Sequence, residues 1–367
     1  MKHRFAQRAL DIEMSGIRKF FQAAKPGSIS LALGQPDFDT PDHIKQAAIV
    51  AINEGKTGYT FNAGLPELRD AISKKLKGEN ALRYHPDQII VTAGAGEALF
   101  IAIQSLVNPG DRVLITDPGF VSYEACTTLA RGVMDALPLD VNLHIDVDAA
   151  MEKMKGARLL ILNSPCNPTG TVESEETIRA LVEAAGDAGV TVLSDEVYEH
   201  LIYDAKHVSA ARFGEDVITV NATSKTYSMT GWRIGYLAGH PDYVEQCLKV
   251  HQYCQTCATS ISQYAAVAAY TGDQSCVKTM RDEYQVRRDL LCRGLHDLGF
   301  KFPTPQGAFY AFVPLGSEVT TKVLDAGVIA VPGDAFGKRA TEYARFSYAT
   351  SRENIARALD RIATVVR

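Results

Sequence analysis

One lysine and one arginine lie eight residues apart in a stretch that reads as two buried strands joined by a polar loop. The stretch runs from Val217 to His240, with Lys225 in the loop and Arg233 just before the second apolar run. A cation in an apolar setting is costly unless an anion, or for lysine a covalent bond, compensates for it. The pattern indicates a site for an anionic ligand that lysine can also bind covalently. The simpler alternative is a solvated lysine and an arginine that stacks on Trp232.

Further polar residues follow apolar runs elsewhere in the chain. Asp195 ends the apolar run Val190 to Ser194, where a buried carboxylate needs a partner unless it only caps a helix. Asn167 begins the sequence NPTG, which is either a site loop or an ordinary turn. The loop Gly94 to Gly96 leads backbone amides into a helix start, and such a start attracts a phosphate dianion.

The elements that must position these residues form a repeating pattern from residue 88 onward. Apolar β-branched runs alternate with helical patterns, which indicates parallel strands covered on both faces. Ligands bind beyond the carboxyl ends of such strands, where these polar residues fall. Earlier in the chain, Thr40 or Asp42 is expected to cap a helix from His43 to Glu54. Later, a long amphipathic helix from about Cys276 to Leu298 is expected to bridge two domains.

Composition restricts the possible classes of protein. The 367 residues are 46% apolar, which allows a large core and suggests two domains. A formal charge of −5 argues against a nucleic-acid surface, and no apolar run reaches the ~20 residues of a membrane span. Seven scattered cysteines in a chain without a recognisable signal peptide favour reduced thiols and a cytoplasmic location. Cys254 and Cys257 form a CxxC without a second ligand pair, so no metal site is expected.

The segment from Ser224 to Tyr236, SKTYSMTGWRIGY, resembles the pyridoxal-phosphate attachment segment of class I and II aminotransferases of fold type I. The resemblance implies that Lys225 attaches the cofactor and that Arg233 holds its phosphate. Many relatives carry Ser or Gly three residues before the lysine, where this chain has Ala222. The phosphate contact of that hydroxyl is therefore missing or is supplied by Ser224.

Other matches to the family appear in the family's order and cover essentially the whole chain. They imply that Asp195 pairs with the pyridine nitrogen, where a protonated ring acts as an electron sink. Asn167 and Tyr198 are implied at the phenolic oxygen of the cofactor. The remaining implied cofactor contacts are Phe120 on the ring, Ala95 and Gly96 at the phosphate, and Tyr59 reaching the phosphate of a dimer partner.

Substrate contacts follow from the same resemblance. Arg345, on a strand in RFSYATS, is implied to bind the substrate α-carboxylate, which a guanidinium fork suits. Its alternative is a solvent-facing cation. Asn167 and the backbone at Gly34 are also implied to contact the substrate, and Ile17 is placed by the resemblance in the segment that closes over the side-chain pocket.

The predicted fold is α/β, of the pyridoxal-phosphate transferase fold type I, with a large domain on a mostly parallel sheet and a smaller α+β domain. The expected division is an N-terminal segment 1–35 that joins the small domain, a large cofactor-binding domain 36–280 and a small domain 281–367. The resemblance also implies a homodimer with shared active sites.

The predicted activity is a pyridoxal-phosphate-dependent aminotransferase in which Lys225 acts as acid and base in turn. Two alternatives stay open: a carbon-sulfur β-lyase, which uses the same lysine and aspartate, and a cofactor-binding regulatory domain without turnover. Aspartate-preferring relatives carry a lysine where this chain has Gly96. The expected donors are therefore aromatic or other bulky amino acids alongside glutamate, with 2-oxoglutarate as acceptor and aspartate as the alternative principal donor.

Overall fold

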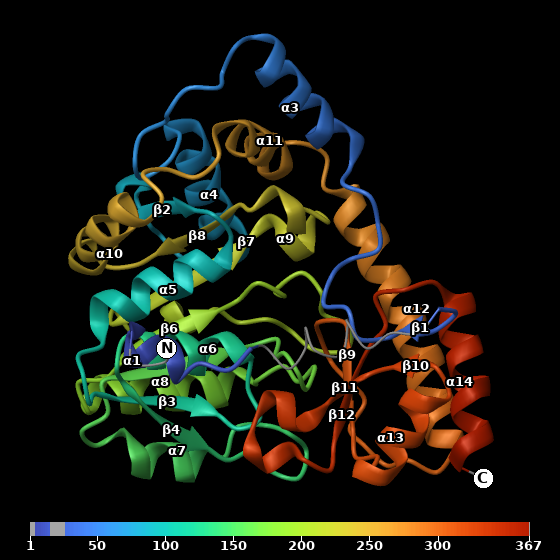
Figure 1. Ribbon diagram of the computed structural model, residues 1–367. Coiled ribbons are helices and arrows are strands. Elements are labelled where there is room, and N and C mark those ends of the chain that lie inside the picture. The colour runs from blue at the N-terminus through green and yellow to red at the C-terminus, as the bar shows by residue number, and fades with distance from the viewer. Residues whose placement is uncertain (1–3, 15–25, 367) are drawn as a thin grey trace.

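The structure is a computed structural model that describes residues 4–14 and 26–366 (Figure 1). The strands are β1 (Ile29–Ser30), β2 (Ile89–Thr92), β3 (Arg112–Thr116), β4 (Val133–Leu137), β5 (Leu159–Asn163), β6 (Thr191–Asp195), β7 (Val217–Ala222), β8 (Gly235–Ala238), β9 (Tyr310–Val313), β10 (Val328–Ile329), β11 (Val331–Pro332) and β12 (Ala344–Ser347). The helices are α1 (Gln7–Leu10), α3 (Asp42–Asn53), α4 (Pro66–Glu79), α5 (Ala95–Leu106), α6 (Val121–Leu129), α7 (Val147–Met154), α8 (Glu175–Asp187), α9 (Thr223–Thr226), α10 (Pro241–Cys254), α11 (Ser260–Thr271), α12 (Ser275–Asp297), α13 (Ser317–Asp325) and α14 (Arg352–Val366).

The central sheet has seven strands in the order β2-β8-β7-β6-β5-β3-β4. Its pairings are parallel from β7 through to β4, and β8 pairs antiparallel with both β7 and β2. Six strands therefore share one direction, which agrees with the mostly parallel sheet expected from the sequence. Their carboxyl ends lie at one edge.

Successive side chains of a strand point to opposite faces of the sheet. Because these strands are continuous apolar runs, both faces of the sheet are apolar. Ile115, Ile161 and Leu193 pack with α5, α6 and α10 on one face, and Leu114, Leu160 and Val192 pack with α7 and α8 on the other. Strands covered on both sides need continuous apolar runs, which is the pattern in the sequence.

A second group of elements forms from the C-terminal part of the chain, at the right of Figure 1. The sheet β11-β12-β9 packs with α12 and α14 around buried residues such as Tyr284, Phe309 and Phe346. The short strand β1 pairs in parallel with β10, so a segment near the N-terminus completes this C-terminal unit.

The expected cap of α3 is wrong. The helix starts at Asp42, its N-cap is Pro41, and no side chain caps it. Thr40 instead donates its hydroxyl to the carbonyl of Ser228 at 2.7 Å, a contact between segments 188 residues apart that the local pattern could not reveal. Within the described ranges, each helix is too short or too polar to traverse a lipid bilayer.

Candidate active site

Lys225, Asp195 and Asn167 come from three different strand ends and meet at the carboxyl edge of the central sheet. Asp195 is the last residue of β6, Lys225 lies in the short helix α9 directly after β7, and Asn167 lies in the loop after β5. The parallel register pairs Asn163 with Asp195 and Asp195 with Val220, so the three strands end side by side. Asn163 then accepts a hydrogen bond from the amide of Asn167 at 2.8 Å, which holds the start of that loop.

The Lys225 ammonium contacts the protein mainly through backbone and aromatic atoms. Its Nζ donates to the carbonyl of Gly34 at 2.6 Å and lies 5.9 Å and 5.8 Å from the ring centres of Tyr198 and Phe309. Burial, together with the charges of Arg345 and Arg233, lowers the pKa of Lys225 to about 8, against the opposing effect of Asp195. About a tenth of this amine is therefore neutral, and nucleophilic, at pH 7.

Asp195 is a carboxylate that is 3% exposed and has no cationic side chain within ion-pair distance among the described residues. Its Oδ2 accepts a hydrogen bond from the hydroxyl of Tyr123 at 2.8 Å. Burial raises the pKa of Asp195 to about 6, although the Tyr123 hydrogen bond opposes the rise. A charged ring nitrogen next to this group would supply the missing counter-ion.

Arg233 is a cation held against the loop that leads into α5. Its φ of 53° lies in the left-handed region, which is unusual for a side chain of this size and points to function. The guanidinium donates to the carbonyls of Thr230 at 2.9 Å and Ala93 at 3.2 Å. An added Cβ at Gly94 would lie 2.5 Å from the guanidinium, so the loop before α5 approaches Arg233 because it lacks a side chain there. Ala95 and Gly96 then begin α5.

Gly235 on β8 also allows a close approach because it lacks a side chain. A Cβ there would lie 2.6 Å from the amide nitrogen of Ala95, so β8 and the start of α5 touch through bare backbone. Ser224 is buried in α9, directly before Lys225. Free amides at a helix start, a hydroxyl and a guanidinium form a donor set that suits a phosphate dianion.

Arg345 is not the solvent-facing cation that its strand position also allowed. The side chain is 1% exposed, and its guanidinium lies between the rings of Tyr310 and Phe336, 4.3 Å and 4.7 Å from their centres. It donates to the side-chain oxygen of Asn167 at 2.7 Å and to the carbonyl of Ala32 at 2.8 Å. None of the described carboxylates pairs with it, and its Nε has no hydrogen-bond partner. A buried guanidinium of this kind requires an anion.

Tyr123, Tyr310 and Phe336 complete the site, and the sequence reasoning missed all three. The hydroxyl of Tyr310 lies 2.9 Å from that of Tyr198, and burial raises the pKa of Tyr198 well above its usual value. An added Cβ at Gly34 would lie 2.6 Å from the Tyr310 hydroxyl. These aromatics lie in ordinary apolar runs, so no local signal separates them from core residues.

Phe120, Tyr59 and Ile17 stand apart from this group. Phe120 precedes α6, and its ring meets that of Tyr123, the hydrogen-bond partner of Asp195, edge-on with 5.5 Å between centres. Tyr59 is 89% exposed, and the surface hollow that it lines includes none of the other predicted site residues. Ile17 lies outside the described residues.

A buried network supports the turn that carries Asp195 and Tyr198. Glu199 accepts hydrogen bonds from Asn80 at 2.7 Å and Asn221 at 2.6 Å, and it pairs with the ammonium of Lys75. Although burial raises the pKa of Glu199, the charges of Lys75, His200 and His207 and the Asn80 hydrogen bond together outweigh it and hold that pKa well below its usual range. Glu196 and His207 lie beside Glu199, with ligand atoms within 4.8 Å of one another. Protein donors reach every oxygen of the two carboxylates, so hydrogen bonds compensate for their burial.

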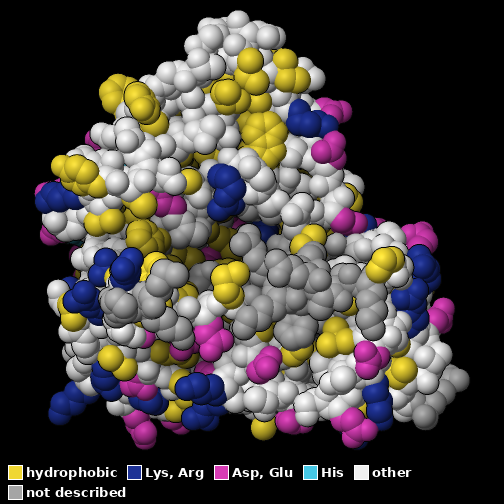
Figure 2. Space-filling model, in the orientation of Figure 1, with side chains coloured by type: hydrophobic (Ala, Val, Ile, Leu, Met, Phe, Trp, Pro, Cys, Tyr) yellow, Lys and Arg dark blue, Asp and Glu magenta, His cyan; other side chains and the backbone are white. Residues whose placement is uncertain are grey.

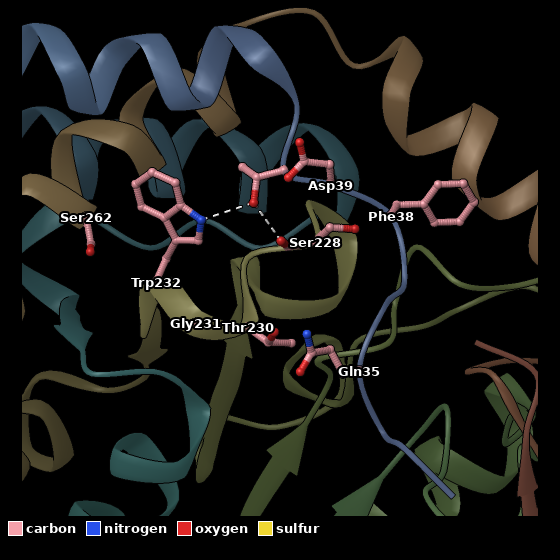
Figure 3. Close-up of a pocket in the computed structure, with 9 residues that line it drawn as sticks. Gln35, Phe38, Asp39, Ser228, Thr230, Gly231, Trp232 and Ser262 are labelled. Carbon is pink, nitrogen blue, oxygen red and sulfur yellow. Dashed lines mark hydrogen bonds between the residues drawn. The ribbon is translucent and has the colours of Figure 1, made fainter. Parts of the chain in front are cut away.

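A cavity of about 410 Å³ adjoins the site between residues 35–40 and 228–232, with Ser262 on α11 (Figure 3). The hydroxyl of Thr40 accepts a hydrogen bond from the indole nitrogen of Trp232 at 3.0 Å and donates to the backbone carbonyl of Ser228 at 2.7 Å, the two dashed contacts in Figure 3. The lining residues do not include Lys225, Asp195 or Arg345. The cavity therefore borders the segments that supply Gly34 and Arg233 and is separate from the cluster of reactive groups.

Comparison with known proteins gives a consistent result. A model of the family described as aminotransferase class I and II matches residues 26–362. The chain is 47% identical over 366 residues to the probable aspartate aminotransferase of Methanocaldococcus jannaschii, covering 96% of this chain and 97% of that protein. It is 38% identical to aromatic-amino-acid aminotransferase 2 of Thermococcus litoralis, covering 97% and 96%. The structure of the aspartate aminotransferase of Thermus thermophilus with maleate matches with a TM-score of 0.94 at 36% identity, covering 98% of this chain and 99% of that one.

Proposed function

The chain belongs to the class I and II aminotransferases, a pyridoxal-phosphate-dependent family with the fold type I architecture, and we propose that its catalytic groups are Lys225, Asp195 and Tyr198. The cofactor, when bound, supplies an electron sink that stabilises negative charge at the substrate Cα. The described residues fit this cofactor on three observations: Asp195 is a buried carboxylate without a cation, Gly94 and Gly235 leave a backbone cradle, and Lys225 has only a carbonyl as its hydrogen-bond partner.

We assign the cofactor contacts from this geometry and from the family resemblance. Lys225 holds the cofactor covalently, and Asp195 pairs with its ring nitrogen. Ser224, Arg233, Ala95 and Gly96 hold the phosphate, while Asn167 and Tyr198 reach the phenolic oxygen and Phe120 lies against the ring. Donors already aimed at a negative group need no rearrangement during the reaction, and such preorganisation is a major source of catalysis.

The Lys225 amine is the proposed acid and base. Its pKa of about 8 leaves a neutral fraction that can take the proton from the substrate Cα, and the protonated form can return it. The Tyr310 hydroxyl keeps Tyr198 in place beside this amine. The Tyr123 hydrogen bond favours the charged form of Asp195, against the effect of its burial.

The observation that carries the substrate assignment is the buried charge of Arg345. Its burial without a carboxylate partner, together with the contact to Asn167, supports binding of a substrate α-carboxylate. Two donors of a planar guanidinium match the two oxygens of that group. Amino acids and 2-oxo acids share the carboxylate, so the same arginine serves both halves of a transamination.

For the side chain of the substrate, we propose that the enzyme accepts aspartate and aromatic donors, with 2-oxoglutarate as acceptor. Relatives named for aspartate and for aromatic amino acids are 47% and 38% identical to this chain, which supports both classes. Gly96 offers no cation for a distal carboxylate, which favours bulky apolar side chains.

The test is a panel of purified reactions. Keto-acid formation from aspartate, phenylalanine, tyrosine and alanine is measured as kcat/KM at fixed 2-oxoglutarate and again without an acceptor. Turnover with aspartate and the aromatic donors that needs 2-oxoglutarate is the expected result. An exclusive preference for aspartate would contradict the side-chain proposal, and release of pyruvate and ammonia from cystathionine without an acceptor would indicate a β-lyase.

We also propose that the enzyme is a homodimer in which Tyr59 enters the partner subunit's phosphate site. Large apolar side chains of one region are exposed to an unusual degree, including Tyr59 at 89%, Phe61 at 69% and Tyr253 at 88%. Ile49, Val50 and Ile52 on α3 add to them, and Figure 2 shows hydrophobic side chains gathered over this end of the molecule. Such patches mark interaction surfaces. Sedimentation should give twice the chain mass of 39.9 kDa, and a monomer that is fully active would refute the proposal.

The domain division and the location remain proposals of the same kind. Separate sheets before and after α12 and the β1 to β10 pairing support a large domain 36–280, a small domain 281–367 and an N-terminal segment 1–35 that joins the small one. Seven free cysteines support a reducing, cytoplasmic location.

A further inference from the structure

The start of α5 carries a charge that opposes phosphate binding. Glu97 lies in the first turn of this helix, and its Oε2 accepts a hydrogen bond from the amide of Ala93 at 2.5 Å. That contact fixes the loop, because Ala93 also supplies the carbonyl that Arg233 holds. A carboxylate in the first turn is favourable for an isolated helix, but it repels a dianion bound at the same helix end. The loop geometry therefore has an electrostatic cost that some other group must offset.

His251, on α10, faces that carboxylate and is 0% exposed. Its Nδ1 lies 2.7 Å from Oε1 of Glu97, and its Nε2 lies 2.9 Å from the carbonyl oxygen of Asn62. A carbonyl and a carboxylate only accept hydrogen bonds, whereas a neutral imidazole has a single N–H. Both contacts are satisfied together when the pair holds a second proton, so that an imidazolium faces the carboxylate and the net charge of the pair is zero.

The second contact of His251 leads to the loop that carries Tyr59. Asn62 donates its side-chain amide to the carbonyl of Thr256 at 2.6 Å, directly after α10. Gln263 on α11 donates to the hydroxyl of Thr60 at 2.9 Å and accepts from the amide of Leu65 at 2.8 Å. The loop between α3 and α4 is thereby fixed against α10, which carries His251, and against α11.

We propose that Glu97 and His251 form a charge-compensated brace, in which His251 is a positioning residue for the cofactor phosphate and connects the phosphate loop with the Tyr59 loop. The inference rests on the proposed function, since it takes the Gly94–Gly96 loop as the phosphate site. His251 cancels the charge of Glu97 at the helix start while the Glu97 hydrogen bond to Ala93 keeps the loop in place. In the proposed dimer, one histidine thus supports the phosphate site of its own chain and, through the Tyr59 loop, that of the partner.

The brace is tested by four variants: His251→Gln, Glu97→Gln, the double variant, and His144→Gln as a control that removes a different histidine–glutamate contact. The dissociation constants of pyridoxal phosphate and of inorganic phosphate are measured on apo-protein, and the thermal midpoint of each apo-protein checks folding. His251→Gln should weaken both ligands about tenfold or more, because an uncompensated carboxylate then faces the dianion.

Recovery of affinity in the double variant distinguishes charge compensation by His251 from a purely structural role of that residue. The double variant replaces the ion pair by two amides and should bind pyridoxal phosphate within about threefold of wild type, a difference below 1 kcal/mol. Glu97→Gln alone should bind at least as tightly as wild type, and His144→Gln should not change the dissociation constant.

Three outcomes would overturn the brace: unchanged affinity in a folded His251→Gln protein, a double variant as weak as His251→Gln alone, or a Glu97→Gln variant weakened about tenfold. The Glu97→Gln measurement still tests the brace if His251→Gln does not fold, because Glu97→Gln leaves the histidine in place. Wild-type protein that carries no cofactor at Lys225 after borohydride reduction would overturn the proposed function and the brace together, which distinguishes the two failures.

Discussion

Arg345 donates a hydrogen bond from its guanidinium to the side-chain oxygen of Asn167 at 2.7 Å, although the two residues are 178 positions apart. Arg345 comes from β12 of the C-terminal sheet, and Asn167 from the loop after β5 of the central sheet. The contact joins a proposed substrate residue to a residue proposed to contact both substrate and cofactor. The proposed site of the substrate α-carboxylate therefore depends on how the two sheets pack.

Arg345→Leu should lower kcat/KM for every amino donor by about 10²- to 10⁴-fold, because two charge-assisted hydrogen bonds to the carboxylate are lost. KM should rise more than kcat falls. Arg361→Leu is a control, because Arg361 also donates two hydrogen bonds, in its case both to backbone carbonyls, but lies in α14, and it should change kcat/KM by no more than about twofold. Equal losses in the two variants would contradict the role of Arg345.

Asp195→Asn should lower kcat by about 10²- to 10³-fold or more while KM changes little. The amide keeps the shape of the side chain but removes the charge that supports a protonated ring nitrogen, and that charge matters most in the transition state. Single-turnover rates measured with one donor check this. Tyr123→Phe, which only removes a hydrogen bond to Asp195, should lose far less, and a near-normal rate in Asp195→Asn would refute the assignment.

The stability of the apo-protein should depend on pH through the Asp195 carboxylate. Burial raises the folded-state pKa of Asp195 to about 6 from its ordinary value of 3.8, so the native state binds more protons than the unfolded state between these values. Its contribution to stability therefore falls as pH rises through that window and is fully unfavourable above about pH 6. Asp195→Asn should stabilise apo-protein above pH 6 by up to about 3 kcal/mol and not below about pH 4. Urea unfolding at pH 4 and pH 7 measures the difference, and an equal effect at both would contradict the raised pKa.

Attachment of pyridoxal phosphate to apo-protein should depend on pH through Lys225. Its pKa of about 8 means that the neutral amine, the nucleophile, increases about tenfold per pH unit below that value and levels off above it. Arg345→Leu should move the midpoint upward, because the charge of Arg345 is the main cause after burial. Stopped-flow absorbance gives the rate, Lys225→Ala should show no covalent attachment, and a midpoint near 10.5 in wild type would exclude the lowered pKa.

Gly34→Ala should reduce activity because its Cβ would lie 2.6 Å from the hydroxyl of Tyr310. The Tyr310 ring is buried beside Phe309 and cannot move away freely. Tyr310→Phe removes the oxygen and leaves the nearest ring carbon 3.6 Å away, so the double variant should recover part of the loss. The comparison is a double-mutant cycle on kcat/KM, and additive losses would show that the contact does not limit Gly34.

The sequence by itself determined those features that depend on local spacing. Continuous apolar runs predicted a parallel sheet covered on both faces, because each strand must bury both of its sides. The segment SKTYSMTGWRIGY placed Lys225 and Arg233 together, since both lie in one loop between adjacent strands. Asp195 was identified because a carboxylate at the end of an apolar run is costly without a partner.

Only the tertiary structure decided how distant residues meet. The hydrogen bonds of Tyr123 to Asp195 and of Tyr310 to Tyr198 join residues 72 and 112 positions apart, and their aromatic side chains look like core residues in the sequence. The same holds for His251, whose two partners come from α5 and from the loop before α4. Local sequence patterns predict the type of each element, from its apolar period, and indicate where a charge is buried. Which groups compensate for that charge depends on the packing of elements that are remote in the chain.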